Sequence, residues 1–355
     1  MIQRSLTLPF LLMVAFAACS DASAVRTDAL AEEAERALRS AAVPEGGILT
    51  DGDSLAAPSA AAVHAGKLIL IDNRSDRPIR LIDVRDGSWW GAFGREGGGP
   101  GEFSGAWSID PVPNTPEFDI YDVNQARLTR VSLEAAGAPA PRLVSTRNLV
   151  ASSIVLGPVS TPAGRVAIGA FGRDRLGVFD ARGELTRSFA PLPPEATGAP
   201  EPVLHHAYQS WLAPNPDRTR LALATRHADR LDIYSPDGRH LASAERPLGF
   251  EPNFGVREGG RGPVMASDDD LRFGYIGLAT TAQRIYALFS GYARSERPGY
   301  ANFGESVYVY DWDGRLHGRY RLPRPAITIA ADAASDLIYA VYHDPEPHIG
   351  WYRIP

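Results

Sequence analysis

Polar residues that could bind a ligand are concentrated in three short segments of the chain, two of them rich in glycine. Arginine side chains can grip carboxylate or phosphate oxygens with a fork of donors and can stack on flat rings. Histidine adds a neutral or charged imidazole near physiological pH. These residue types favour an anionic or sugar ligand. The candidate ligand-binding residues are Arg95, Glu96, Glu102, His205, His206, Arg257 and Glu258.

The same residues have a structural interpretation. The run 97–101 is Gly-Gly-Gly-Pro-Gly, a composition that fits a loop because glycine loses much backbone freedom on ordering. Arg95 could hold this loop by binding a carboxylate or backbone carbonyls, and Glu102 could accept hydrogen bonds from nearby N–H groups. Both interpretations stay open from the sequence.

No residue is identified as catalytic, and the sequence predicts neither a bound metal nor a cofactor. Adjacent residues in a strand point to opposite faces, so His205 and His206 could share one ion only in a loop. No cysteine ligand and no His-Glu-x-x-His motif accompany them. The chain also lacks the Gly-x-Ser-x-Gly elbow of many serine hydrolases.

The N-terminus has the pattern of an export signal. Arg4 is followed by an apolar run from Leu6 to Ala18, which is too short to span a membrane. The run ends just before Cys19, the single cysteine of the chain. We therefore predict a signal peptide over residues 1–18, and acylation of Cys19 that anchors the protein to a membrane.

This N-terminal pattern resembles a bacterial lipobox, although Phe16 stands where an aliphatic residue is usual. In lipoproteins of this kind, a serine such as Ser20 after the cysteine favours the outer membrane, facing the periplasm or the cell surface. Residues 19–45 are rich in Ala, Glu and Arg. Their apolar positions are nearly all alanine, so we expect a lipidated tether, transiently helical, that buries too little surface to dock firmly.

From residue 46 to 355 the chain alternates short apolar runs with Gly, Pro, Asp and Asn, which is typical of an all-β fold. One unit recurs six times: an apolar strand, a second strand, a tight turn that is often Asp-Gly, and a third strand. Each unit has room for a fourth strand, and four-stranded units repeated radially are β-propeller blades. The prediction is a six-bladed β-propeller of four-stranded antiparallel blades, preceded by the signal peptide and the short tether.

The last unit lacks its outer strand, because the sequence stops at Pro355. The segment Gly47-Ile48-Leu49 precedes the first unit and is apolar enough to supply it. Pairing of the two ends would close the ring and leave no open sheet edge.

The Arg-Glu-Gly-Gly segment at 95–98 and the Gly-Pro-Gly-Glu-Phe segment at 99–103 resemble loops of two families. These are the six-bladed propeller lipoproteins of the TolB-like group and the NHL-repeat proteins. Asp122, followed by the pair Arg127-Leu128, matches the NHL pattern, with Gln125 in place of the usual Asn. The resemblance covers most of residues 46–355 and implies the propeller fold, while propellers host both enzymes and binding modules.

In a propeller, the loops between blades and the turns between the second and third strands share one face around the channel. The seven candidate residues are expected on that face. We predict a binding lipoprotein that holds an envelope protein, a peptide or a glycan. The alternative is a metal-dependent propeller hydrolase or lyase of the lactonase or esterase type. The net charge of −6 is small and mixed in sign, which does not indicate a nucleic-acid partner.

Overall fold

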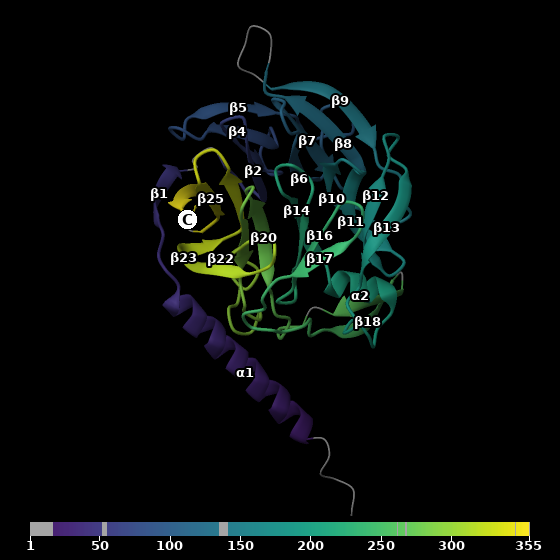
Figure 1. Ribbon diagram of the computed structural model, residues 1–355, viewed down its shortest axis with the longest axis vertical. Helices are drawn as coiled ribbons and strands as arrows, with labels where there is room; N and C mark the ends of the chain where they lie inside the picture. Colours follow the sequence, from purple (N-terminus) through teal and green to yellow (C-terminus); the bar gives the residue numbers. More distant parts are fainter. Residues whose placement is uncertain are drawn as a thin grey trace, which may run out of the picture.

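The computed structural model describes residues 17–51, 55–134, 141–260, 262–266, 268–344 and 346–354, with side chains from residue 29 onward. Six four-stranded antiparallel sheets are arranged around a central channel, which confirms the predicted propeller (Figure 1). Residues 1–16 and the side chain of Cys19 lie outside the described part, so the signal peptide and the acylation site remain predictions. Among the described residues, no helix combines the length and hydropathy needed to cross a membrane.

The first three blades follow the chain from the channel outward. Blade 1 consists of β2 (Ala60–His64), β3 (Lys67–Ile71), β4 (Ile79–Asp83) and β5 (Trp89–Phe93). Blade 2 consists of β6 (Ala106–Pro111), β7 (Glu117–Asp122), β8 (Arg127–Ser132) and β9 (Arg142–Asn148). Blade 3 consists of β10 (Leu156–Thr161), β11 (Gly164–Phe171), β12 (Asp174–Phe179) and β13 (Leu185–Pro191).

The other three blades complete the ring. Blade 4 consists of β14 (Ser210–Pro214), β15 (Leu221–Thr225), β16 (Leu231–Tyr234) and β17 (His240–Ser243). Blade 5 consists of β20 (Tyr275–Thr280), β21 (Ile285–Phe289), β22 (Gly304–Tyr310) and β23 (Leu316–Ala326). Blade 6 consists of β24 (Thr328–Asp332), β25 (Leu337–Tyr342), β26 (His348–Arg353) and β1 (Glu45–Thr50).

The core lies between adjacent blades, so the middle strands are buried on both faces. Ile69 of β3 packs with Phe118 and Ile120 of β7, which joins blade 1 to blade 2. A larger cluster joins blades 4 and 5 around Phe289 and Tyr308. This two-sided burial explains why the middle strands read as continuous apolar runs instead of alternating ones.

Several outer hairpin turns use glycine for two reasons at once. Gly87, Gly183 and Gly314 have φ values of 71°, 84° and 86°, which glycine adopts without steric cost. A Cβ on Gly183 would lie 2.1 Å from the carbonyl oxygen of Asn148, at the end of the outer strand of the preceding blade. Glycine recurs in these turns because the turn geometry requires it and because a neighbouring blade leaves no space for a side chain.

The N-terminal strand closes the ring as predicted. β1 pairs antiparallel with β26, with Gly46 opposite Tyr352 and Ile48 opposite Gly350. Blade 6 then packs on blade 1 through a cluster that includes Ile349 and Leu68. The sheet edge left by β26 is thereby covered.

The helix that precedes β1 differs from the expected tether. Helix α1 (Ala17–Ser40) extends from the rim of the ring, in purple in Figure 1. Ala34, Ala37 and Leu38 in its C-terminal half are buried. Glu35 accepts hydrogen bonds from the hydroxyl of Tyr292 (2.7 Å) and from Nη2 of Arg297 (2.8 Å). The expectation that this segment buries too little to dock is therefore wrong for residues 34–38.

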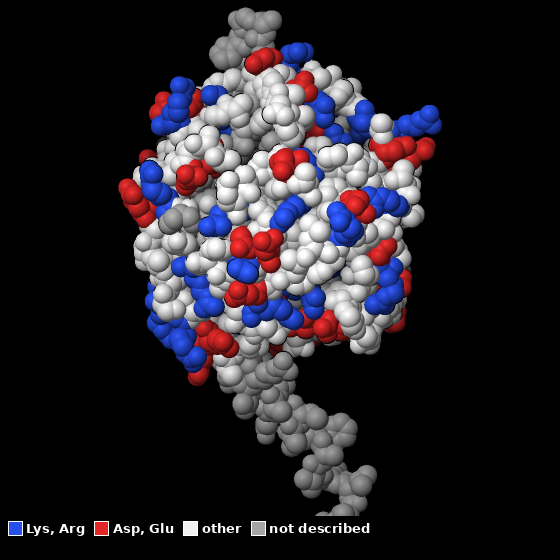
Figure 2. All heavy atoms as spheres, in the orientation of Figure 1, with Lys and Arg blue, Asp and Glu red and all other residues white. Residues whose placement is uncertain are grey.

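Two smaller elements sit on the ring outside the blades. Helix α2 (Glu201–Ala207) packs against the hairpin of β18 (Gly255–Gly259) and β19 (Gly262–Ala266), and Figure 1 shows them together at one edge. Their shared apolar cluster includes Val203, Leu204 and Met265. Figure 2 shows basic and acidic side chains interspersed over the face in view, in agreement with the small net charge.

Candidate functional site

The central channel opens into a cavity at each end. The upper mouth, as we call it, is a cavity of about 440 Å³ where the inner strands of the blades begin. The lower mouth is a cavity of about 530 Å³ where the same strands end. Both cavities touch four apolar residues that form the waist between them: Ala61, Ile109, Leu212 and Leu278. The apolar inner strands expected from the sequence thus separate the two mouths.

The inner strand of blade 3 begins after a short apolar segment. Ile154 and Val155 belong to that segment by composition, but β10 starts at Leu156. Ile154 lies in the preceding loop and is 73% exposed. Leu156 takes the expected place at the channel and lines the upper mouth.

The upper mouth combines aromatic rings with polar groups from four blades. Its walls include the second residue of two inner strands, Trp107 of β6 and Trp211 of β14. Trp107 is 37% exposed, whereas Nε1 of Trp211 donates to the carbonyl oxygen of Tyr275 (2.9 Å) and fixes that ring. The larger polar wall residues are Gln209, Arg226, Asn302 and His343, and hydroxyl groups come from Ser59, Ser108, Ser210 and Thr328.

Arg226 is held in place through its backbone. It immediately follows β15, and its N–H donates to the carbonyl oxygen of Gln209 (2.7 Å). Its own carbonyl oxygen accepts from the N–H of Gly274 (2.7 Å). Arg226 therefore stands directly across from Gln209, and both line the same wall of the upper mouth.

The guanidinium of Arg226 has no acidic partner among the described residues. Its Cζ lies 5.5 Å from the ring centroid of Phe273, and Cζ of the exposed Arg294 lies 5.6 Å from the same ring. None of the ion pairs between described residues includes either arginine. Burial, followed by the charge of Arg294, lowers the pKa of Arg226. Arginine nevertheless stays protonated in proteins, so Arg226 places a positive charge without a described counter-charge at this mouth, and the exposed Arg294, which does not line the cavity, adds a second positive charge beside Phe273.

Two histidines beside these arginines are held neutral. His227 is buried against Phe273, with ring centroids 5.0 Å apart, and its Nδ1 has no hydrogen-bond partner among the described residues. Burial, followed by the charge of Arg226, lowers the pKa of His227 to about 3. The pKa of His206 is also lowered, by burial and by Arg226. The positive charge at the upper mouth therefore comes from the arginines.

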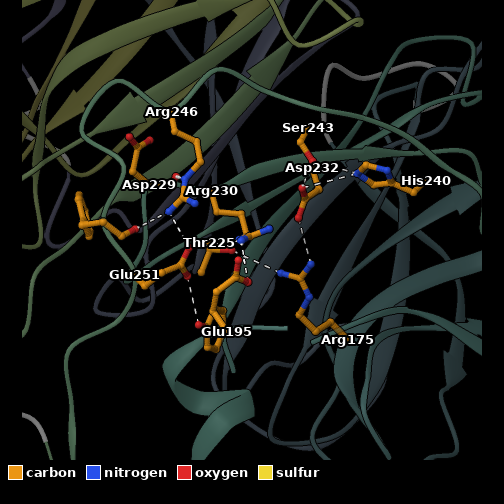
Figure 3. A network of polar contacts seen from close by, with 12 residues as sticks. Arg175, Glu195, Thr225, Asp229, Arg230, Asp232, His240, Ser243, Arg246 and Glu251 are labelled. Atoms are coloured by element: carbon orange, nitrogen blue, oxygen red, sulfur yellow. Dashed lines mark hydrogen bonds and ion pairs between the residues drawn. The ribbon is translucent and has the colours of Figure 1, made fainter. Parts of the chain in front are cut away.

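The turn that carries Arg226 also contains a contrasting arginine. Arg230 donates to Glu195 (3.1 Å) and Glu251 (3.3 Å), and Arg246 also binds Glu251 (2.6 Å), as Figure 3 shows. Three charged groups thus surround Arg230, while Arg226, four positions earlier, faces the cavity without a carboxylate.

None of the seven sequence-predicted candidates lines the upper mouth. Nε of Arg95 donates to Oε1 of Glu102 (2.7 Å), and Oε2 of Glu102 accepts from the N–H of Gly99 (2.7 Å). Those contacts lower the pKa of Glu102. Glu96 forms an isolated backbone bridge with Phe103 within the same loop. These contacts match the structural interpretation of the loop, and they lie at a separate surface hollow.

Arg127 contributes more to this loop than Arg95 does. Its guanidinium donates to the carbonyl oxygens of Gly98 and Gly99 at 2.9 Å each, and also to that of Glu102. Asp122 accepts from the N–H groups of Ser104 (2.6 Å) and Gly105 (3.0 Å). The Asp and Arg of the NHL-like pattern therefore hold the loop between blades 1 and 2.

The remaining candidates lie on the two elements outside the blades. His205 and His206 are in helix α2, not in a loop as expected, and Nε2 of His205 lies 2.6 Å from the carbonyl oxygen of Gly172. Arg257 and Glu258 are exposed in β18. None of these four residues lines the upper mouth, although the charge of Arg226 contributes to the lowered pKa of His206.

The structure also brings together a serine, a histidine and an aspartate that the sequence did not connect. Oγ of Ser243 donates to Oδ1 of Asp232 (2.7 Å), and Nε2 of His240 lies 3.1 Å from that Oγ (Figure 3). In a catalytic triad the serine donates to histidine and the aspartate binds the other ring nitrogen. Here the serine proton points to the aspartate, whose other oxygen accepts from the buried Arg175 (3.2 Å). This cluster links blades 3 and 4 and lines neither mouth.

Metal ligands are not clustered either: in the part of the chain with described side chains, no three His, Cys, Asp or Glu residues are placed to hold an ion. The polar groups at the upper mouth are guanidinium, amide, imidazole, indole and hydroxyl. This set can donate hydrogen bonds, attract negative charge and stack on flat surfaces.

Comparison with known proteins places the propeller in a family. The model of the family described as TolB-like 6-blade propeller-like matches residues 57–332. The chain belongs to this family. The match covers the inner strands of all six blades and every described residue named above at the upper mouth except His343.

Solved structures agree with this assignment at the level of the fold. A protein of Bacteroides fragilis described as exported is similar with a TM-score of 0.53 and 11% identity, over 88% of this chain and 96% of that one. A member of the DUF4221 family from Bacteroides vulgatus is similar with a TM-score of 0.55 and 10% identity, over the same shares of the two chains. No curated protein sequence matches this TolB-like chain.

Proposed function

We propose that this TolB-like propeller is a binding protein of the bacterial cell envelope, and that its ligand occupies the upper mouth. The observation that carries the proposal is Arg226, a largely buried guanidinium that lines a cavity beside two tryptophans and has no acidic partner among the described residues. Charged groups away from water are ordinarily paired. A bound ligand would supply the missing partner.

The size and walls of the upper mouth support this proposal. Its volume of about 440 Å³ is within the range of small-ligand sites, which are largely apolar with a few placed polar groups. Trp211 is fixed by its hydrogen bond to Tyr275, so one ring face is preformed. Trp107 is partly exposed, so a ligand stacked on it would remove apolar surface from water.

Native mass spectrometry can test ligand binding with the small-molecule fraction of an envelope extract as the probe. We expect a discrete adduct on the wild-type protein that is lost in Trp107→Ala. Trp89→Ala is the matched control, because Trp89 is similarly exposed, at 44%, but lies in an outer strand. An adduct that persists in Trp107→Ala, or no adduct on the wild type, would contradict the proposal. So would turnover of an ester or lactone that is lost on chelation of a bound metal, which would favour the hydrolase alternative.

The envelope location is proposed from the sequence around Cys19. Ala17 and Ala18 precede the single cysteine, and the family match and the likeness to an exported protein accord with export. The proposed mature chain begins at acylated Cys19, and the partner is an envelope peptide, protein or glycan. Intact-mass measurement should show acyl chains on the wild type and their absence in Cys19→Ser. A wild-type protein that begins at another residue and stays in the aqueous phase would overturn the anchor.

A further inference from the structure

The charges around the upper mouth indicate the chemical class of the ligand more closely than the shape of the cavity does. Arg226 lines the cavity, and the guanidinium groups of Arg226 and Arg294 lie 5.5 and 5.6 Å from the ring centroid of Phe273, with no described carboxylate to offset them. Each positive charge raises the free energy of the other at close range. Phe273 attracts both guanidinium groups through its ring face, which partly offsets this repulsion. A negatively charged ligand group would offset it far more, because a guanidinium binds carboxylate or phosphate oxygens with two parallel hydrogen bonds.

Two amide side chains at the same mouth are also without partners. Gln209 and Asn302 line the cavity, and neither side chain makes a hydrogen bond to another described residue. An amide offers two donors and a carbonyl acceptor, which is the complement of ligand hydroxyl groups. Indole faces of Trp107 and Trp211 offer flat apolar surface to a ring.

We propose that the upper mouth binds an acidic sugar, meaning a pyranose ring that carries a carboxylate. This inference rests on the proposed function and specifies its ligand. The carboxylate faces Arg226, with the charge of Arg294 nearby, the hydroxyl groups bind Gln209 and Asn302, and the apolar face of the ring stacks on an indole. A neutral sugar would supply no negative charge to the guanidinium groups. A simple anion would supply no ring for the indoles to stack on and no hydroxyl groups for the amides to bind.

Matched pairs of sugars separate the contribution of the carboxylate from that of the ring. Glucuronic acid and glucose form one pair, and N-acetylmuramic acid and N-acetylglucosamine form the other, with a carboxylate on the first member of each. Titration of the full mature chain by calorimetry or by NMR should show binding of at least one acidic member. Its neutral counterpart should bind at least tenfold more weakly. Added salt should weaken the binding of the acidic sugar, because salt screens the attraction between its carboxylate and the arginine.

Three variants locate the binding. Arg226→Gln should lower the affinity for the acidic sugar at least tenfold. Arg294→Gln should lower it less, because Arg294 is more exposed. Arg182→Gln is the control, since Arg182 is exposed in the outer turn between β12 and β13 and lines neither mouth. Thermal unfolding of each variant establishes that it is folded.

The outcomes distinguish this inference from the proposed function. Equal binding of acidic and neutral sugars, or unchanged binding in Arg226→Gln, would overturn the acidic-sugar assignment. Binding of acetate or inorganic phosphate through Arg226 without binding of any sugar would also overturn it, in favour of a plain anion site. If no sugar binds but an envelope adduct still depends on Trp107, the acidic sugar is wrong and the binding function stands.

Discussion

The two mouths of the channel each contain an arginine, but only the lower one pairs it. At the lower mouth, Arg218 donates to Oδ1 of Asp110 and to the carbonyl oxygen of Pro111. Asp110 in turn accepts from the N–H (2.7 Å) and Oγ (2.9 Å) of Ser160. These contacts join blades 2, 3 and 4. At the upper mouth, Arg226 has neither a carboxylate nor a described hydrogen bond from its side chain.

The difference teaches how to separate structural from functional polar residues in this fold. A buried charge whose partners come from neighbouring blades stabilises the ring and leaves little for a ligand. A buried charge without a partner lowers stability, which a ligand can restore. The mutations below test this distinction, beginning with the largest expected change in the free energy of unfolding.

Asp110→Ala should be the most damaging change, because it leaves Arg218 buried without its counter-charge. Removal of one member of a buried pair typically lowers stability by about 3–5 kcal/mol. Urea unfolding measures the loss. A change close to zero would show that the lower mouth is not held by this pair, and the comparison between the mouths would fail.

His227→Phe should change the response to acid. The pKa of His227 is about 3 in the folded protein against 6.5 for the free side chain, so the unfolded chain takes up the proton first as pH falls. The wild type is therefore fully stabilised above about pH 6.5 and loses about 1.4 kcal/mol per pH unit below it. By pH 4.5 the wild type should have lost about 2–3 kcal/mol more than the variant.

The histidine at the lower mouth gives the matched comparison for that experiment. The pKa of His64 is also lowered, mainly by burial, but a hydrogen bond with the backbone of Thr115 opposes the shift. His64→Phe should therefore remove a smaller part of the acid sensitivity than His227→Phe does. Chemical unfolding at several pH values gives both results. Identical pH profiles for His227→Phe and the wild type would mean that folding does not lower the pKa of His227.

Gln209→Glu should convert the upper mouth into a paired site like the lower one. Gln209 lies directly across from Arg226, and opposite charges across a strand pair contribute roughly 0.2–1 kcal/mol. We expect a small increase in thermal stability together with loss of acidic-sugar binding, because the new carboxylate occupies the guanidinium. Lower stability with unchanged binding would show that Gln209 and Arg226 do not interact.

Arg226→Gln should have the smallest effect on stability. The change removes an unpaired charge and leaves no described partner behind, so the free energy of unfolding should rise slightly, by at most about 0.5 kcal/mol in urea unfolding. A loss as large as that of Asp110→Ala would show that Arg226 is structural and would remove the distinction between the mouths.

The sequence predicted the architecture well because the fold depends on local patterns. Apolar runs and turn glycines such as Gly183 and Gly314 recur with each blade, and the apolar segment at Ile48 had an obvious place in the last one. The docked helix was missed because an alanine surface looks weak by itself. Ala34 packs close to Gly291, where a Cβ would lie 3.3 Å from the Cβ of Ala34, so two small residues allow a tight contact.

The candidate site could be predicted only in part. The sequence placed polar turns around one end of the channel, but it could not show which arginine lacks a partner. Arg175 and Asp232 pair across 57 positions, and Arg95 and Glu102 pair within one loop. The two tryptophans could have been found from the sequence, because Trp107 and Trp211 both occupy the second position of an inner strand. Alignment of the blades with each other would have shown two aromatic residues at one level of the channel.

The pairing of β1 with β26 has a consequence for how the protein acquires its fold. Glu45 and Arg353 are roughly 300 residues apart, so their contact forms only after nearly the whole chain has been synthesised. Until then β1 has no partner strand, and its open edge can pair with other chains. Blades 1 to 5 are built from consecutive strands and can form in order, whereas ring closure is a late, long-range step. We therefore expect ring closure to set the overall folding rate.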